Sequence, residues 1–453
     1  MPFVRDLLRY TNKYFLETGT YQGDTTQLVA DSGLFEKIYT VEFSEILHRD
    51  AVSRFAQTPA VHCFHASSRT DLWTLIQDIR DPITFWLDAH WSSAGNVGVD
   101  SEVICPVLEE LEQIKKHPIK NHTIIVDDMR RMDGKHFPVT IQQILQKIRE
   151  INPNYIFRGY TDSETVGDVL VAFVGPEPPQ IAVHKYLTKC QNNPQPPGFG
   201  DVMRGIIAMY YHSRKYNYRL ILDTSSHPLL KYLQPCDHTL EYKLNDNVHE
   251  FIPGPHMPRG FDQIDEELEG RFKSGELFCC VTDAFYKESQ DPEVVKDCKE
   301  FMKRFLTPSD ALKHTIIEEY KILGVDLTRP YIAIHFRFGD VCLENSQVYS
   351  PDVVKFYSER LTAILEGNPS AQFVLLTDSE AMGKMLKEKN SRIMYSNSKK
   401  LHTGSLSATL EGLERAAIDM FIIIKSQLIL SNSRSGFSWN PAYVFDIPYY
   451  PVF

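Results

Sequence analysis

Carboxylates and a histidine follow two strands that the first half of the sequence predicts. Asp88 follows the apolar run PITFWL, with His90 two residues later, and Asp127 and Asp128 follow HTIIV. Because neighbouring parallel strands end at one edge of an α/β sheet, we expect these side chains to lie together. Three carboxylates suit Mg²⁺, and a neutral imidazole there would accept the proton of a substrate hydroxyl. A helix cap and an ordinary loop histidine are the alternative interpretation.

A strand, a glycine turn and a helix are predicted for residues 14–26, YFLETGTYQGDTT. Gly19 and Gly23 allow the backbone to bend and to approach a ligand closely. Their spacing matches neither the phosphate-binding loop nor the dinucleotide fingerprint. The segment is therefore either a loop for another ligand or an ordinary turn between a strand and a helix.

Two further residues at predicted strand ends suit a nucleoside. Glu42 ends the strand KIYTVE about one βαβ step after Gly19. Its two carboxylate oxygens can accept both hydroxyls of a ribose, although a surface glutamate is the alternative. Ser67, at the exit of the third predicted strand, is placed to face an adenine edge.

Composition limits the function classes. The chain has 453 residues, 43% hydrophobic and 24% charged, with a net charge of −11, which predicts a globular protein of roughly two or three domains and disfavours general binding to nucleic acid or to an anionic membrane. No apolar run reaches about 18 residues, and the N-terminus lacks a signal-peptide core. The eight cysteines show no C-x-x-C spacing, so neither zinc nor a disulfide framework is indicated, and a cytoplasmic location is expected.

Strands and helices alternate on both sides of a proline-rich seam. Up to residue 177 the pattern predicts a doubly wound sheet of roughly six or seven strands. Two breaks, GPEPP at 175–179 and NNPQPPG at 192–198, place a linker at 178–195. From 196 a second α/β module begins, with a first part at 196–328 and a second part at 329–453.

Arg337 is the strongest candidate in the second module. It follows the strand YIAIHF, whose last residues include His335, and precedes Gly339. A guanidinium is always charged and binds phosphate through two parallel hydrogen bonds. The segment 431–438 adds serine and asparagine donors, and Gly198, Gly200 and Asp201 open a helix. An ion pair between Arg337 and Asp340 and a simple helix-start turn are the alternatives.

The first half resembles small class I methyltransferase-like domains over about residues 1–175. The matching segments are residues 17–23, FWLDAHW (85–91), CPVLEEL (105–111) and IIVDD (124–128), and the aspartate pattern is similar to that of metal-dependent O-methyltransferases. The resemblance implies S-adenosyl-L-methionine as cofactor, Mg²⁺ as metal and His90 as the catalytic base. It implies cofactor contacts from Glu17, Thr18, Gly19, Gly23, Thr25, Glu42, Ser67 and Asp88, and metal ligation by Asp88, Asp127 and Asp128.

The second half resembles fucosyltransferases over about residues 190–453. The matching segments are the glycine turn 198–205, the HxRxGD motif at 335–340, Thr377-Asp378-Ser379 and the loop 431–439. The resemblance implies a two-Rossmann, GT-B-like module with an acceptor half (196–328) and a nucleotide-sugar donor half (329–453). Such a module uses GDP-fucose without a donor metal and inverts the anomeric centre. It implies that Arg337 holds the β-phosphate as a catalytic residue. The implied nucleotide-sugar contacts are Gly198, Gly200, Asp201, His335, Arg337, Gly339, Asp378, Ser435, Gly436 and Phe437.

Together these patterns predict a bifunctional enzyme of glycan synthesis. One half would transfer fucose or a related deoxyhexose from a GDP-sugar to a glycan acceptor, and the other would O-methylate a sugar hydroxyl. A fucosyltransferase with an inactive methyltransferase-like scaffold is one alternative. A non-catalytic protein that binds nucleotides or glycans is the other. Expected partners are a nucleotide sugar and a glycan or glycoconjugate, with no nucleic acid and no membrane span.

Overall fold

The computed structural model describes residues 5–90, 104–160, 168–185, 198–225, 229–244, 249–251, 278–280, 292–338, 350–396 and 410–453. The chain forms two compact units, Met1–Ile181 with Leu240–Asn245 and Ala182–Thr239 with Asp246–Phe453. Within the predicted linker, Ile181–His184 forms strand β8. The predicted domain limits at 177 and 195 remain predictions.

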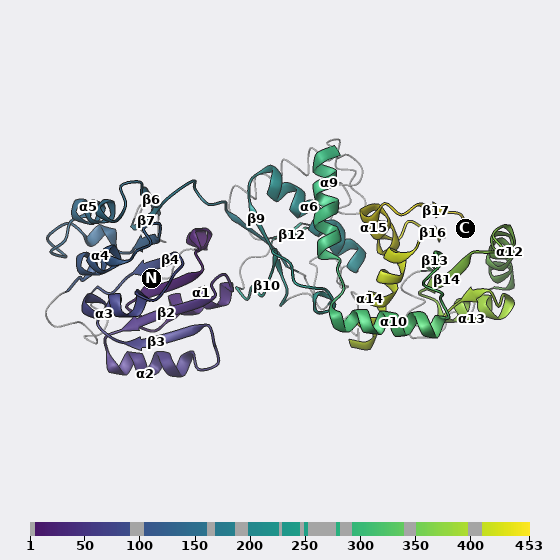
Figure 1. The fold of residues 1–453 in the computed structure, drawn as a ribbon, viewed down its shortest axis with the longest axis horizontal. Helices are drawn as coiled ribbons and strands as arrows, with labels where there is room; N and C mark the ends of the chain where they lie inside the picture. Colours follow the sequence, from purple (N-terminus) through teal and green to yellow (C-terminus); the bar gives the residue numbers. More distant parts are fainter. Residues whose placement is uncertain are drawn as a thin grey trace. The chain divides into compact units, whose positions relative to one another are not determined.

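A seven-stranded sheet, ordered β3-β2-β1-β4-β5-β7-β6, forms the centre of the first unit (Figure 1). Its strands are β1 (Tyr14–Thr18), β2 (Lys37–Glu42), β3 (Val61–His65), β4 (Ile83–Leu87), β5 (Thr123–Val126), β6 (Ile156–Tyr160) and β7 (Val169–Phe173). Strands β1 to β5 pair in parallel, and β7 pairs antiparallel with β5 and β6. The order reverses between β1 and β4, the point at which such sheets bind ligands.

The helices of the first unit connect these strands. They are α1 (Asp24–Ser32), α2 (Glu45–Arg54), α3 (Ser68–Ile76), α4 (Val107–Lys116) and α5 (Ile141–Ile151), with the 3₁₀ turns η1 (Arg5–Tyr10) and η2 (Met129–Arg131). Helix α5 begins with a capping box formed by Thr140 and Gln143. Its buried residues Ile144, Ile148 and Ile151 recur at helical spacing and face the core. Every residue of β4, β5 and β7 is buried, as expected for central strands covered on both faces.

A five-stranded parallel sheet, ordered β15-β14-β13-β16-β17, lies in the second unit. Its strands are β13 (Tyr331–Phe336), β14 (Gln372–Thr377), β15 (Ile393–Met394), β16 (Leu428–Ser431) and β17 (Tyr449–Pro451). A smaller sheet joins β8, β9 (Arg219–Asp223) and β10 (Thr239–Leu240), and β11 (His249–Phe251) pairs with β12 (Phe278–Cys280). The order of the five-stranded sheet reverses between β13 and β16, which places a second expected ligand crevice there.

The described helices of the second unit pack around two apolar clusters. They are α6 (Phe199–Lys215), α9 (Pro292–Phe305), α10 (Asp310–Leu323), α12 (Pro351–Gly367), α13 (Glu380–Lys389), α14 (Leu410–Lys425) and α15 (Gly436–Phe445), with the 3₁₀ turn η3 (Leu230–Tyr232). One cluster is formed with α6, α9, α10, α14 and α15 and the other with α12 and α13. The predicted α/β class with Rossmann-like sheets is confirmed. The GT-B-like arrangement of two Rossmann layers remains a prediction.

The predicted loop at 431–439 is wrong in its second half, because α15 begins at Gly436. The Ser435 side chain caps this helix by accepting a hydrogen bond from the Phe437 backbone N–H at 3.4 Å. Serine, glycine and Pro441 all disfavour a helix in isolation, and burial of Ala442 and Val444 in the core outweighs that preference.

Candidate functional site

The predicted glycine turn lies where β1 meets the residue that follows β4. Gly19 has a φ of +82°, and a Cβ built on it would lie 2.6 Å from the Asp88 carbonyl oxygen. Both facts require glycine at this position. The Asp88 backbone N–H donates to the Thr18 carbonyl oxygen at 3.2 Å, so the end of β1 and the exit of β4 are joined. Gly23 is the N-cap residue of α1, and Thr25 is buried in its first turn.

Glu17 points into the first unit and is 2% exposed. Its Oε2 accepts hydrogen bonds from the hydroxyl of Thr40, at 2.6 Å, and from that of Thr26. Burial raises the pKa of the Glu17 carboxyl to about 8, since the charged form loses its hydration. Glu17 thereby ties β1 to β2 and α1, which sets the shape of the glycine turn.

Glu42 holds the same turn from β2. Its Oε2 accepts the Tyr21 backbone N–H at 2.9 Å, and its Oε1 accepts the Ser44 N–H at 2.8 Å. Each carboxylate oxygen has a second acceptor position that a ribose hydroxyl can use. Ser67 is the N-cap residue of α3, and its backbone N–H donates to Asp71 Oδ2 at 3.0 Å.

His90 lies between two of the predicted acids. Its Nε2 is 3.0 Å from Asp88 Oδ1 and 3.1 Å from Asp128 Oδ2. Burial lowers the pKa of the imidazole, but the hydrogen bond and the charge of Asp88, with the charges of Asp128 and Asp127, outweigh it and raise the pKa above its ordinary value. Burial, followed by the Asp88 charge, raises the pKa of Asp127 to about 7. The predicted residues Asp88, His90 and Asp128 therefore lie together, and the contacts of His90 with the two carboxylates favour its protonated form.

The carboxylates that could hold a metal differ in part from the predicted set. Asp127, Asp128 and Asp168 each place an oxygen within 4.8 Å of the others. Asp88 is not part of that group and reaches Asp128 through His90. Asp168 immediately precedes β7, and because β7 runs antiparallel to β5, its start lies at the edge where β5 ends. An acid just before an antiparallel neighbour strand was the signal that the sequence analysis missed.

Arg130 binds two of these three carboxylates. Its guanidinium nitrogen Nη2 lies 2.7 Å from Asp128 Oδ1, and Nη1 contacts Asp168 Oδ2. The Arg130 backbone N–H also donates to Asp168 Oδ1 at 2.8 Å. Three oxygen ligands suit Mg²⁺ by type, but here the Arg130 guanidinium contacts Asp128 and Asp168, and His90 contacts Asp128. The residues as arranged do not fit a divalent metal ion.

In the second unit, the end of β13 is held by the ends of both neighbouring strands. The Arg337 backbone N–H donates to Asn432 Oδ1 at 2.8 Å, and Asn432 Nδ2 donates back to the Arg337 carbonyl at 3.2 Å. The Arg337 side chain donates to Asp378 Oδ2 at 2.5 Å, and Asp378 Oδ1 accepts the Phe338 N–H at 2.9 Å. Asp378 therefore orients Arg337. Asn432 was not among the predicted site residues, although its place after β16 was a usable signal.

The glycine turn at the start of α6 lies directly against the start of α15. A Cβ on Gly200 would lie 2.6 Å from the carbonyl carbon of Gly436 and 2.7 Å from the Phe437 nitrogen. Asn440 Nδ2 donates to the Gly200 carbonyl at 2.5 Å. A Cβ on Gly436 would lie 3.5 Å from Arg204 Nη2. Two helix N-termini and a guanidinium therefore lie together.

His335 connects this junction to β13. Its ring, 5% exposed, lies 5.9 Å from the Phe437 ring between centroids, and its carbonyl accepts the Ser431 hydroxyl at 2.8 Å. Gly198 is the N-cap residue of α6, and the Asp201 backbone lies in its first turn. Gly339 lies outside the described residues. Four motifs far apart in the sequence thus reach one region.

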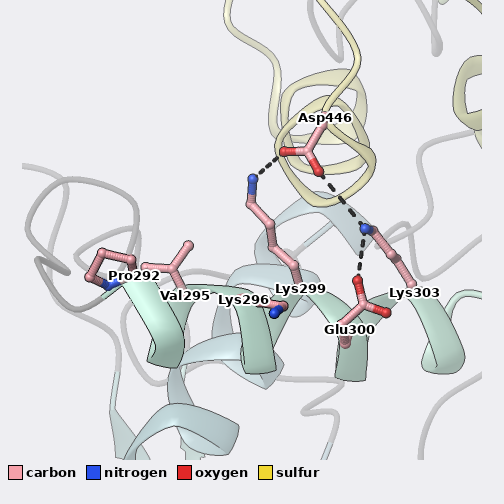
Figure 2. Close-up of a pocket in the computed structure, with 7 residues that line it drawn as sticks. All are labelled: Pro292, Val295, Lys296, Lys299, Glu300, Lys303 and Asp446. Atoms are coloured by element: carbon pink, nitrogen blue, oxygen red, sulfur yellow. Dashed lines mark hydrogen bonds and ion pairs between the residues drawn. The ribbon is translucent and has the colours of Figure 1, made fainter.

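A surface cavity of about 380 Å³ lies elsewhere in this unit, beside α9 (Figure 2). It is lined by Pro292, Val295, Lys296, Lys299, Glu300, Lys303 and Asp446. Figure 2 shows Lys299 and Lys303 both reaching Asp446, and Lys303 also donates to Glu300 at 3.0 Å. None of the residues predicted from the sequence lines this cavity, and its charges largely pair with one another.

Comparison with known proteins gives a resemblance in two parts. No protein-family model and no curated protein matches the chain. The fucosyltransferase NodZ from Bradyrhizobium is 12% identical, with a TM-score of 0.39, over 60% of this chain and 92% of that one. An O-methyltransferase from Bacillus cereus in complex with SAH is 18% identical, with a TM-score of 0.27, over 37% of this chain and 77% of that one. The O-methyltransferase TomG from Streptomyces achromogenes is 16% identical, with a TM-score of 0.27, over 37% of this chain and 75% of that one.

These TM-scores and identities leave the function to be argued from this chain's own residues. Within the described part of the chain, no helix combines the length and the apolar character needed to cross a lipid bilayer.

Proposed function

We propose that this protein is a bifunctional glycan-modifying transferase. Its second unit transfers fucose, or a related deoxyhexose, from a GDP-sugar to a glycan acceptor. Its first unit O-methylates a sugar hydroxyl with S-adenosyl-L-methionine. The cytoplasmic location expected from the sequence is kept as part of this proposal.

The observation that carries the proposal is the meeting of the α6 and α15 N-termini next to Arg204. Free backbone N–H groups and the positive ends of helix dipoles favour a bound anion. The Arg204 guanidinium adds hydrogen-bond donors in a geometry that matches phosphate oxygens. A diphosphate would accept hydrogen bonds from these donors, and the β13 end with Arg337 is connected to this junction through His335 and Phe437.

In the sugar transfer, the acceptor hydroxyl oxygen attacks C1 of the sugar while the bond from C1 to the β-phosphate oxygen breaks. The electron pair of that bond leaves with GDP, the proton of the acceptor hydroxyl passes to solvent water, and the configuration at C1 is inverted. Arg337 neutralises the charge that develops on the departing phosphate. Asp378 acts as a positioning residue for Arg337, while His335, Ser435, Gly436 and Phe437 line the nucleotide. Gly198, Gly200, Asp201 and Gly339 supply backbone close to the donor.

In the first unit, the turn at Gly19 and Gly23 would hold S-adenosyl-L-methionine at the β1–β4 crevice. Bound there, the cofactor supplies an electrophilic methyl group to a sugar hydroxyl. Glu42 would bind the ribose hydroxyls, and Glu17, Thr18, Thr25, Ser67 and Asp88 would shape or line the site. His90 would take the hydroxyl proton. No metal step enters the proposal, because Arg130 and His90 already contact Asp128, and Arg130 also contacts Asp168.

The experiment for the second unit is calorimetric titration of the full chain with GDP. We expect Arg337→Ala to weaken GDP binding roughly 10- to 100-fold, because charged hydrogen bonds contribute about 1.5–3 kcal/mol. Arg337→Lys keeps the positive charge but cannot form two parallel hydrogen bonds to phosphate. Its GDP affinity should therefore lie between those of the wild type and Arg337→Ala. Arg329→Ala, which removes the same charge just before β13 begins, is the matched control. Equal GDP affinity in Arg337→Ala and Arg329→Ala would contradict the proposal.

One observation favours the alternative in which the first unit is a scaffold. The predicted base, His90, is held between Asp88 and Asp128, and these carboxylates raise its pKa and so favour the protonated form, which cannot accept the hydroxyl proton. Binding of S-adenosyl-L-methionine without methyl transfer to any glycan tested would support this alternative. Methyl transfer that is lost in His90→Asn would exclude it.

A further inference from the structure

We infer that Arg130 is the built-in cation of the first unit's site, so that the protein binds no divalent metal ion at Asp127, Asp128 and Asp168. The inference rests on the proposed methyltransferase site, but its test measures metal binding and needs no methyl transfer. It corrects the magnesium expected from the sequence and gives Arg130, a residue that the sequence analysis did not select, a defined role.

Both oxygens of Asp128 are already occupied. Oδ1 pairs with Arg130 Nη2 at 2.7 Å, and Oδ2 lies 3.1 Å from His90 Nε2. A magnesium ion needs oxygen ligands at about 2.0–2.1 Å in near-octahedral geometry. Such an ion at Asp128 would have to displace Arg130 or His90 or lie against it, and at that range the guanidinium charge would repel the ion strongly.

Asp168 depends on Arg130 for its charge balance. Its side chain is 0% exposed, and it receives both the guanidinium and the backbone N–H of Arg130. A fully buried carboxylate is stable only when it is paired and hydrogen-bonded. The pairing is also anchored through the backbone, because the Met129 N–H donates to the Asp168 carbonyl at 2.8 Å. A backbone hydrogen bond therefore already holds the turn that carries Arg130 against Asp168.

Arg131 provides a matched comparison on the same turn. Its Nε lies 3.7 Å from Asp128 Oδ2, a longer and weaker contact than either contact of Arg130. Its side chain is about as exposed as that of Arg130, 35% against 37%. Replacing either arginine removes one positive charge next to the same aspartate, but only the change at Arg130 releases Asp168.

The test is titration of the full chain with Mn²⁺, in which the electron paramagnetic resonance signal of the free ion reports binding. Mg²⁺ is then added as a competitor. We expect no saturable binding by the wild type or by Arg131→Gln across the millimolar range. Arg130→Gln should bind Mn²⁺ at least roughly tenfold more tightly, the scale on which residues around metal ligands change affinity. Adding Asp168→Asn to Arg130→Gln should abolish the Mn²⁺ binding that Arg130→Gln gains.

Saturable Mn²⁺ binding by the wild type that Asp127→Asn abolishes would overturn the inference. So would a folded Arg130→Gln protein that binds Mn²⁺ no better than Arg131→Gln. If Arg130→Gln does not fold, the wild-type titration still decides. A separate calorimetric titration with S-adenosyl-L-methionine tests the proposed methyltransferase function. Failure of the inference about metal binding can therefore be distinguished from failure of the proposed function.

Discussion

Glu17 is a carboxyl group whose environment favours its neutral form. Its folded-state pKa is about 8, whereas its ordinary value is 4.5, and burial is the largest cause. Between these two values the folded state holds a proton that the unfolded state has lost. The contribution of Glu17 to stability therefore falls as pH rises from about 4.5 to 8. The residue orders the glycine turn at a cost that increases with pH.

Glu17→Gln removes this titration and keeps an oxygen to accept the Thr26 and Thr40 hydroxyls. We expect the variant to gain stability relative to the wild type between pH 5 and pH 8, by at most about 1.4 kcal/mol per pH unit. The melting temperature of both proteins, measured across this range, tests the expectation. Parallel pH profiles for the two proteins would show that Glu17 does not titrate in this window.

The junction of α6 and α15 is the element on which the proposed donor site depends. Because a Cβ on Gly200 would lie 2.6 Å from the backbone of Gly436, Gly200→Ala must push the two helices apart. Overpacking of this kind costs about 1–3 kcal/mol. We expect a lower melting temperature together with weaker GDP binding.

Gly367→Ala is the control, since a Cβ at Gly367, in the last turn of α12, meets no atom within 4 Å. It should leave GDP affinity unchanged and alter stability only slightly, because alanine has the higher helix propensity. Weaker GDP binding by Gly367→Ala as well would indicate a nonspecific effect of glycine replacement in this unit.

The sequence predicts elements well where the apolar pattern decides them. The strands that end at Thr18, Leu87, Val126 and Phe336 are all observed, because runs of buried apolar residues leave few alternatives. Asp168 and Asn432 were missed because their role depends on which strands are neighbours. Arg130 was missed because a charged residue after a strand end has no sequence signal for the partner it binds. The start of α15 was missed because its helix is stabilised by tertiary packing rather than by propensity.

At the scale of the molecule, each of the two units has its own sheet and its own order reversal. The ends of β1 and β4 define the candidate site of the first unit, and the ends of β13, β14 and β16 with the α6–α15 junction define that of the second. Because each candidate site is built from residues of one unit, we expect the two ligands to bind independently. Saturation with S-adenosyl-L-methionine should therefore leave the affinity for GDP unchanged.

The most direct test of the whole account is calorimetric titration of the full chain with S-adenosyl-L-methionine and with GDP-fucose, in separate experiments and then in sequence. The account predicts one site for each ligand and the same affinity for each in the presence of the other. Binding of GDP-fucose alone would reduce the first unit to a scaffold. Binding of neither ligand would contradict the account at both sites.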